Sequence, residues 1–174
     1  MGRRIKIMAF ASDGLFSKMG LNERHQLIGE ITSLLVCSPL HRKYLVDDIG
    51  VVFFPAIDLN QFRIYKVNQR PVALITWANL TKPIEYRYLA GDYTLKRDDW
   101  NGGDRTWIID FLAPFGHTKQ VAHDLKYNVF PHRSARSIRV DFNGNVRGTR
   151  VFHGCNVAKG FRKKAAGTHS EMHG

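Results

Sequence analysis

The chain has 174 residues, of which 44% are hydrophobic and 24% are charged, a composition typical of one folded domain with its own core. Lysine and arginine outnumber aspartate and glutamate by 26 to 15, which gives a formal net charge of +11. Such a surplus favours an anionic partner, but it does not distinguish a polyanion from an acidic protein or an anionic lipid surface. The sequence contains no apolar run of bilayer length and no clean signal-peptide cleavage site, so we expect a cytoplasmic protein without a membrane span.

The two cysteines, Cys37 and Cys155, are far apart in the sequence and lack the close spacing of metal ligands. The sequence therefore indicates neither a zinc site nor a disulfide framework. We expect free thiols and no bound metal.

The predicted elements begin after a flexible extension of mixed composition, residues 1–20. Asn22 is able to cap a helix, and the apolar residues that follow recur at helical spacing until Pro39 ends the pattern. The residues on this helix face are Leu27, Ile28, Ile31, Leu34 and Leu35. A later, continuous apolar run, Ile49–Ile57, is predicted to be a strand.

Two further strands, Phe62–Val67 and Val72–Trp77, are predicted to form a hairpin through residues 68–71. A short helix is expected to begin near Thr81, because the following proline is tolerated in a first helical turn. The polar segment 96–105 contains a glycine pair and is predicted to be a loop.

A central strand begins at Thr106, and a helix over residues 118–129 follows it. The strongest hairpin signal in the chain is Asn143-Gly144, which lies between the apolar segments 137–142 and 146–152. Strands and helices interleave, with hairpins at both ends of the sheet. The sequence therefore predicts an α+β fold of three layers, in which helices flank a mixed central sheet.

One carboxylate, Asp110, lies in the middle of the central strand. Because side chains alternate between the faces of a strand, Asp110 is predicted to share a face with Ile108 and Leu112. Burying an ion there costs several kcal/mol unless a cation or hydrogen-bond donors contact it. The pattern alone leaves open whether Asp110 pairs with an arginine, lies on a solvated face or takes part in chemistry. The opposite face is predicted to hold Trp107, Ile109 and Phe111.

Among the eight histidines, His41 is the main candidate for chemistry. It follows the helix-ending proline within a polar corner, Ser38-Pro39-Leu40-His41-Arg42. The alternatives are a scaffold role for this imidazole and a Cys37/His41 nucleophile pair, for which no third group is evident. No glycine-rich nucleotide loop is present, although backbone N–H groups at the helix start near Thr118 are able to bind one phosphate.

Several short motifs follow one another in a defined order. They are Ser38-Pro39-Leu40-His41-Arg42, Pro55-Ala56-Ile57, Trp77-Ala78-Asn79-Leu80, Asp99-Trp100, Gly103-Asp104-Arg105, Trp107-Ile108-Ile109-Asp110, Ala113-Pro114-Phe115-Gly116, Ile138-Arg139-Val140-Asp141 and Phe152-His153-Gly154. Together these motifs resemble those of the RTX-toxin-activating lysine acyltransferases, the haemolysin-activating family. The resemblance extends from the first predicted helix to the last hairpin.

This resemblance implies an enzyme that moves a fatty acyl group from acyl carrier protein to internal lysines of a secreted, pore-forming RTX protoxin and so activates it. It implies an acyltransferase domain over residues 21–160 with a fold similar to that of the Gcn5-related N-acetyltransferases, followed by a frayed basic tail, residues 161–174. No cofactor is expected to stay bound, because the acyl group arrives on the phosphopantetheine of an acidic carrier. The implied partners are the carrier and the protoxin, and a homodimer is left open.

The resemblance also implies which residues form the site. By motif position, the catalytic histidine and aspartate of the family correspond to His41 and Asp110, and Ser38 falls on a serine of the histidine motif. In the related acetyltransferase fold, the loop after the equivalent strand and the following helix start receive the cofactor's phosphates. The residues at that place here are Phe115, Gly116, His117 and Thr118. Two positions depart from the family pattern, where Val52 replaces an asparagine and Cys155 replaces the second residue of a double glycine.

The expected chemistry is removal of a proton from a lysine amine. A pKa of ~10.4 makes the neutral amine about 4.6 kcal/mol unfavourable at pH 7, and a histidine with a pKa of ~6.5 is suited to accept the proton. Asp110 is expected to hold the other nitrogen of the imidazole. A variant in which His41 itself becomes acylated uses the same two residues and stays open.

Two other classes of protein compete with this reading. A small basic nucleic-acid-binding domain would expose aromatic rings beside its cations, whereas Trp77 and Trp107 lie in apolar strands, so no nucleic acid partner is expected. A coenzyme-A-dependent amine acetyltransferase would carry a glycine-rich loop for the pyrophosphate, and this loop is missing from the sequence.

Overall fold

The fold is built around one six-stranded sheet with the strand order β1-β2-β3-β4-β5-β6. The structure is a computed structural model that describes residues 8–9, 19–91, 93–141 and 143–157. All neighbouring strands are antiparallel except β4 and β5, which are parallel. The strands are β1 (Met8–Ala9), β2 (Phe62–Val67), β3 (Arg70–Leu80), β4 (Arg105–Leu112), β5 (Ser134–Val140) and β6 (Val146–His153).

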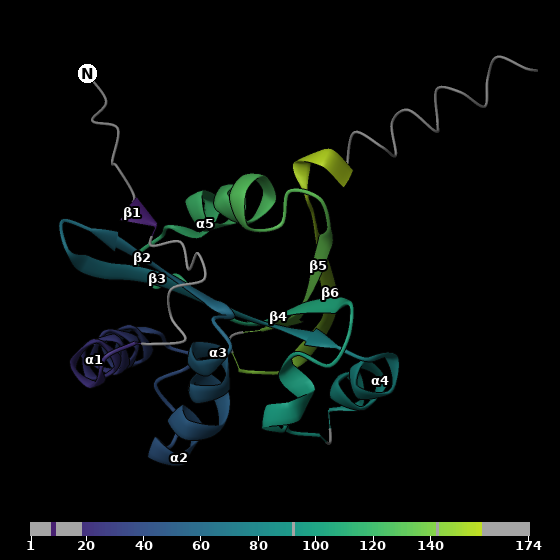
Figure 1. Ribbon diagram of the computed structural model, residues 1–174, viewed down its shortest axis with the longest axis horizontal. Helices are drawn as coiled ribbons and strands as arrows, with labels where there is room; N and C mark the ends of the chain where they lie inside the picture. The colour runs from purple at the N-terminus through teal and green to yellow at the C-terminus, as the bar shows by residue number, and fades with distance from the viewer. Residues whose placement is uncertain (1–7, 10–18, 92, 142, 158–174) are drawn as a thin grey trace, which may run out of the picture.

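Helices cover both faces of this sheet (Figure 1). The helical segments are α1 (Leu21–Cys37), α2 (Val46–Asp48), η2 (Ile49–Phe53), α3 (Phe54–Asp58), α4 (Lys82–Ala90), η3 (Arg97–Trp100), α5 (Thr118–Asp124) and η4 (Leu125–Val129). In Figure 1, α1 to α4 lie on one side of the sheet and α5 lies on the other. The buried apolar residues accordingly form two clusters, one with Ile31, Phe53 and Trp107 and one with Val121 and Leu125. The α+β prediction with a mixed central sheet is confirmed.

The segment 49–57 is helical, so the prediction of a strand there is wrong. The buried side chains Phe53, Ala56 and Ile57 recur at helical spacing, whereas Val51 is 38% exposed. Pro55 lies in the first turn of α3, where its missing N–H is not needed. A short, continuous apolar run does not distinguish a buried helix from a buried strand by periodicity.

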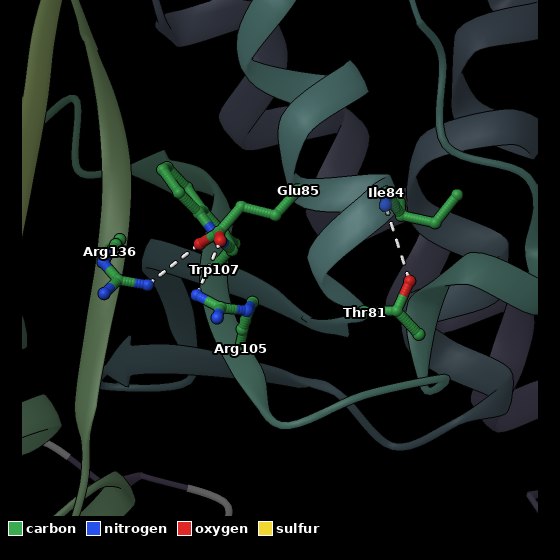
Figure 2. A network of polar contacts seen from close by, with 6 residues as sticks. All are labelled: Thr81, Ile84, Glu85, Arg105, Trp107 and Arg136. Atoms are coloured by element: carbon green, nitrogen blue, oxygen red, sulfur yellow. Dashed lines mark hydrogen bonds and ion pairs between the residues drawn. The ribbon is translucent and has the colours of Figure 1, made fainter.

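The other predicted helices and strands are confirmed, whereas the predicted loop 96–105 contains the short 3-10 helix η3. The helix α1 ends at Cys37 and buries the predicted apolar stripe, with Ile28 only partly buried. Its N-cap is Gly20, so the assignment of Asn22 as the cap is wrong. The strands β2 and β3 form a hairpin whose turn residues, Asn68 and Gln69, both have positive φ, as a two-residue hairpin turn requires. Thr81 caps α4, because its hydroxyl accepts a hydrogen bond from the Ile84 N–H at 3.4 Å (Figure 2). The helix after the central strand and the β5–β6 hairpin also form as predicted.

Only part of the two predicted terminal segments is described. Residues 8–9 of the predicted extension form β1, which pairs with Lys66 and Tyr65 of β2. The remainder of the extension up to residue 18, and the predicted tail 161–174, lie outside the described residues.

The sheet opens between β4 and β5. These parallel strands are paired at only two positions, Trp107 with Arg136 and Ile108 with Ser137. Both strands continue for several residues towards their carboxyl ends, but they do not pair with each other beyond these two positions. The separation of the two strand ends creates space within the sheet, next to the middle of β4.

Glu85 of α4 joins β4 to β5 at the closed end of this opening (Figure 2). Its Oε1 accepts hydrogen bonds from Trp107 Nε1 and Arg136 Nη1, each at 2.9 Å, and its Oε2 accepts one from Arg105 Nη1 at 2.8 Å. Tyr88, one turn further along α4, packs edge-on against the Trp107 ring, with the ring centroids 5.6 Å apart. The helix α4 therefore holds the two strands together at the point from which they separate.

Candidate active site

A β-bulge in β4 sets the position of Asp110. The register between β3 and β4 changes by one residue opposite Thr76, so that Ile109 and Asp110 both lie against this single partner. Bulges redirect side chains and are frequent next to active sites. Here the carboxylate of Asp110 points towards Tyr44 and His41, in the segment that follows α1.

The bulge also changes which residues share a face of β4. The alternation predicted for an uninterrupted strand is wrong beyond the bulge, because Leu112 packs in the same cluster as Trp107, and Phe111 packs with Ile108. One inserted residue exchanges the faces of all the residues that follow it.

Asp110 is buried, with 2% of its surface exposed, and it accepts two side-chain hydrogen bonds. The Thr76 hydroxyl donates to Oδ2 at 3.0 Å and also accepts a hydrogen bond from the Asp110 N–H at 3.1 Å. The Tyr44 hydroxyl donates to Oδ1 at 3.3 Å. Burial raises the pKa of Asp110 to about 6, although both hydrogen bonds act in the opposite direction. The carboxylate is therefore mostly ionised at neutral pH.

His41 is fixed by the turn that ends α1. Ser38 is the C-cap residue of α1, and its carbonyl accepts hydrogen bonds from the N–H groups of His41 and Arg42 at 3.1 and 2.9 Å. The Ser38 hydroxyl lies 2.7 Å from Nδ1 of His41, and the Tyr44 ring packs edge-on against the imidazole at 5.4 Å. The imidazole is 8% exposed, and this burial lowers the pKa of His41.

The structure brings His41 and Asp110 together, although they lie 69 positions apart in the sequence. Nε2 of His41 lies 3.8 Å from Oδ1 of Asp110, which is longer than a hydrogen bond. Ser38, and not Asp110, is the residue bonded to Nδ1. The carboxylate consequently faces the nitrogen that is left without a hydrogen-bond partner among the described residues.

A cavity of about 550 Å³ lies at the opening between β4 and β5, and both members of the pair line it. Its walls are largely apolar, with Ile109 and Phe111 contributed by β4 and Ile138 and Val140 by β5. The imidazole and the carboxylate are therefore reached through an apolar space.

The four residues predicted to bind a phosphate do not all lie at this cavity. Thr118, at the start of α5, lines it, whereas Phe115, Gly116 and His117 do not. Phe115 is 52% exposed in the turn before the helix. His117 is the N-cap residue of α5, and its Nδ1 is buried without a hydrogen-bond partner among the described residues.

Three basic residues at the cavity were missed by the sequence analysis. They are Lys119, Arg139 and Arg150. The usable signal was strand alternation, because Ser137 and Arg139 lie two residues apart on β5 and therefore share a face. The position of this face relative to α5 depends on the tertiary fold and is not readable from the sequence.

Comparison with known proteins identifies the family. Residues 21–152 match the sequence profile of the RTX toxin acyltransferase family. The chain belongs to this family. The RTX-I toxin-activating lysine-acyltransferase ApxIC of Actinobacillus pleuropneumoniae is 37% identical over 139 residues, which cover 80% of each chain. The protein-lysine myristoyltransferase HlyC of Escherichia coli is 35% identical over 146 residues, 84% of this chain and 85% of that relative. The leukotoxin-activating lysine-acyltransferase LtxC of Aggregatibacter actinomycetemcomitans is 36% identical over 147 residues, 84% and 86% of the two chains.

Membership of the RTX toxin acyltransferase family confirms the resemblance based on the ordered motifs, and it assigns the chain to the acyltransferases. Trp77 and Trp107 are 9% and 1% exposed, so neither ring is available to stack on a base. Within the described part of the chain, no helix has the length and apolar character to cross a membrane. The described residues also contain no group of three or more histidines, cysteines or acids arranged to hold a metal ion.

Proposed function

We propose that this acyltransferase transfers a fatty acyl group from acyl carrier protein to internal lysines of an RTX protoxin in the cytoplasm and thereby activates the toxin. The printed names of two relatives support this proposal, because ApxIC is a toxin-activating lysine-acyltransferase and HlyC is a protein-lysine myristoyltransferase. The observation that carries it within the chain is the buried pair of His41 and Asp110 at the end of an apolar cavity. This pair combines a base with an anion, which is what an incoming lysine needs.

The first requirement of the reaction is a neutral amine. A lysine with a pKa of ~10.4 must lose a proton at a cost of about 4.6 kcal/mol at pH 7. One neutral hydrogen bond contributes only about 1 kcal/mol net and does not meet this cost. The proposal therefore assigns His41 as the general base.

The geometry indicates which nitrogen of His41 accepts the proton. Because Nδ1 is engaged with Ser38, Nε2 is the nitrogen that faces Asp110 and the cavity. The 3.8 Å between Nε2 and Oδ1 of Asp110 leaves room for a lysine nitrogen at hydrogen-bond distance from both atoms. The carboxylate attracts the ammonium group and then stabilises the imidazolium. Because burial lowers the pKa of His41, the imidazole is neutral at pH 7 and is able to accept a proton.

Proton and bond changes balance in the following sequence. The ammonium group of the lysine loses one proton to solvent by way of Nε2. The neutral amine then attacks the thioester carbonyl carbon, and a second proton passes to Nε2 as the C–N bond forms. When the C–S bond breaks, the imidazolium returns this proton to the leaving thiolate. The products are an amide, the thiol of the carrier and one proton.

The cavity provides the binding site for the donor substrate in this proposal. Its apolar walls suit an acyl chain and the arm of phosphopantetheine, since burial of apolar surface contributes about 25 cal/mol per Å². Of the four predicted phosphate-binding residues, only Thr118 is retained, because it lines the cavity. Lys119 beside it supplies a positive charge for the single phosphate.

Intact-mass spectrometry tests this function directly. A protoxin segment that contains candidate lysines is incubated with the enzyme and with acyl carrier protein loaded with acyl chains of defined length. We expect the segment to gain the mass of one acyl group per modified lysine, only when the enzyme is present. Absence of any mass gain for all chain lengths, or a gain from acyl-coenzyme A alone, would contradict the proposal. The mass of the enzyme, measured with the donor but without the acceptor, separates general-base catalysis from acylation of His41.

A further inference from the structure

Three basic side chains line the cavity: Lys119 of α5, Arg139 of β5 and Arg150 of β6. We call these three exposed residues the basic rim. Strand alternation places Arg139 on the same face as Ala135, which is buried in the cluster beneath α5. The Arg150 guanidinium lies over the ring of Phe152, 5.2 Å from its centroid, and this ring packs against the same cluster. The rim is therefore on the side of the sheet that α5 covers.

Among the described residues, no acidic side chain neutralises the basic rim. From residue 117 to residue 157 the sequence has seven lysines and arginines but only two acids, Asp124 and Asp141. Asp124 is paired with Arg63 at 2.9 Å, and Asp141 is paired with Arg147 at 2.7 Å. Among the described residues, none of the three rim side chains forms an ion pair with an acid. Uncompensated like charges at the mouth of a cavity attract a partner of opposite charge.

We propose that the basic rim is the surface on which acyl carrier protein docks, with acidic side chains of the carrier facing Lys119, Arg139 and Arg150. The inference rests on the proposed function, which makes an acidic carrier the acyl donor. Docking at the rim directs the phosphopantetheine arm of the carrier into the cavity from the side of α5.

The position of His41 explains why the rim receives the carrier and not the acceptor protein. His41 follows α1, whose buried residues belong to the cluster on the opposite side of the sheet from α5. The lysine of the acceptor must reach Nε2 of His41, so the acceptor occupies that side. The cavity contains residues from both sides, Tyr44 and Tyr88 from one and Lys119 and Ala122 from the other. The thioester therefore crosses the sheet through the opening between β4 and β5.

Charge reversal at the rim tests the proposal with apo carrier protein, which lacks the phosphopantetheine arm. Isotope-labelled apo carrier is titrated by NMR with wild-type enzyme and with the variants Lys119→Glu, Arg139→Glu and Arg150→Glu at low salt. We expect each reversal to raise the dissociation constant about three- to tenfold, and added salt to weaken wild-type binding more than variant binding. Arg70→Glu is the matched control, because Arg70 is exposed at the β2–β3 turn and does not line the cavity.

Several results would overturn the inference. One is an absence of any spectral change in the apo carrier with the wild-type enzyme. A second is an equal rise in the dissociation constant with Arg70→Glu. A third is a rise with the rim variants that is seen only when the titration is repeated with carrier that has its phosphopantetheine arm attached. The last of these would assign the rim to the phosphate alone. Loss of acceptor binding in place of carrier binding, or binding of a nucleic acid of random sequence that competes with the carrier, would also overturn it. If a reversal unfolds the protein, Arg139→Gln and Arg150→Gln serve in its place.

The test distinguishes failure of this inference from failure of the proposed function. If the wild-type enzyme transfers no acyl group from the carrier to a lysine, the proposed function is wrong. If transfer occurs but the rim variants bind the carrier as the wild type does, only the docking surface is wrong.

Discussion

The carboxylate of Asp110 is 2% exposed, and its two side-chain partners, Thr76 and Tyr44, are neutral hydroxyls. Hydrogen bonds from such donors do not replace the hydration that an ion loses on burial, so the pKa of Asp110 rises to about 6. The imidazole of His41 is near enough to stabilise the carboxylate only when it is protonated, and burial disfavours that form. An ionised Asp110 is therefore unfavourable for folding stability, although the proposed mechanism requires it.

Asp110→Asn is expected to stabilise the protein at neutral pH while it slows transfer. The folded-state pKa of about 6 lies above the ordinary value of 3.8, so wild-type stability due to this group is complete below about pH 4 and is lost as the pH rises through 6. A shift of about 2 units corresponds to roughly 3 kcal/mol as an upper limit. Urea unfolding of both proteins from about pH 4 to pH 8 measures the difference. A difference that does not grow with pH, or a variant that is less stable at pH 8, would contradict this assignment.

Ser38→Ala is expected to lower kcat without a comparable change in KM. Ser38 binds Nδ1 of His41 at 2.7 Å and so leaves Nε2 towards Asp110. Loss of this partner frees the ring to adopt the wrong tautomer, which we expect to reduce kcat roughly tenfold or more. The pH at which activity appears should also fall, because the imidazolium loses a hydrogen-bond acceptor. Ser33→Ala, which removes a hydroxyl from the exposed side of α1, is the control and should leave the pH profile unchanged.

At the scale of elements, the site depends on two irregularities in β4: the bulge at Ile109 and Asp110 and the early end of its pairing with β5. The bulge directs the carboxylate, and the lost pairing creates the cavity. Glu85 holds the strands together beside this opening, because its carboxylate bonds to Trp107 of β4 and Arg136 of β5 at the first of the two paired positions. Glu85 does not line the cavity, so we infer that it acts through the strands, as a positioning residue.

Glu85→Gln is expected to raise KM for the acylated carrier more than it lowers kcat. The amide keeps some hydrogen bonding, but it loses the charge that pairs with Arg105 and Arg136, whose side chains are 34% and 43% exposed. For such partly exposed pairs we expect a loss of about 1–2 kcal/mol in the free energy of unfolding. Steady-state kinetics and urea unfolding measure the two effects. Glu30→Gln breaks a comparable pair with Lys66 away from the opening; an equal rise in KM in this control would show that Glu85 has no positioning role.

The sequence was sufficient for the elements with strong local signals and insufficient where tertiary contacts decide. The helix start near Thr81 and the hairpin at Asn143-Gly144 were predicted because their chemistry is local. The helical segment 49–57 was missed because its apolar run has no resolved period, and the β4 bulge was missed because nothing in β4 alone marks an extra residue opposite Thr76.

The candidate site was also predictable only in part: its motifs identify residues, whereas their arrangement depends on tertiary contacts. His41 and Asp110 were selected through the motifs that contain them, and the structure shows that they meet. The partner of Nδ1, the shape of the cavity and the basic rim follow from the packing of segments that are distant in the sequence. Other motif residues have a steric role. In the motif Gly103-Asp104-Arg105, a Cβ atom at Gly103 would lie 2.2 Å from the carbonyl oxygen of Leu80, so only glycine fits at this position.

At the scale of the whole molecule, the sheet separates two sides to which we assign different functions. The α1 side holds the imidazole, and the α5 side holds the basic rim. The cavity at the β4–β5 opening is the connection between them. In this account the two protein substrates bind on opposite sides, and only the acyl thioester and the lysine side chain enter the cavity.

The most direct test of the central claim is a double-mutant cycle on acyl transfer. Single-turnover transfer to a protoxin segment is measured by intact mass for the wild type, His41→Ala, Asp110→Asn and the double variant. Because the two residues are proposed to act as one unit on one proton, each single variant should lose roughly 100-fold or more, and the double variant should be no slower than the slower single variant. Single variants that retain nearly the full rate, or losses that multiply in the double variant, would contradict a shared role for the imidazole and the carboxylate.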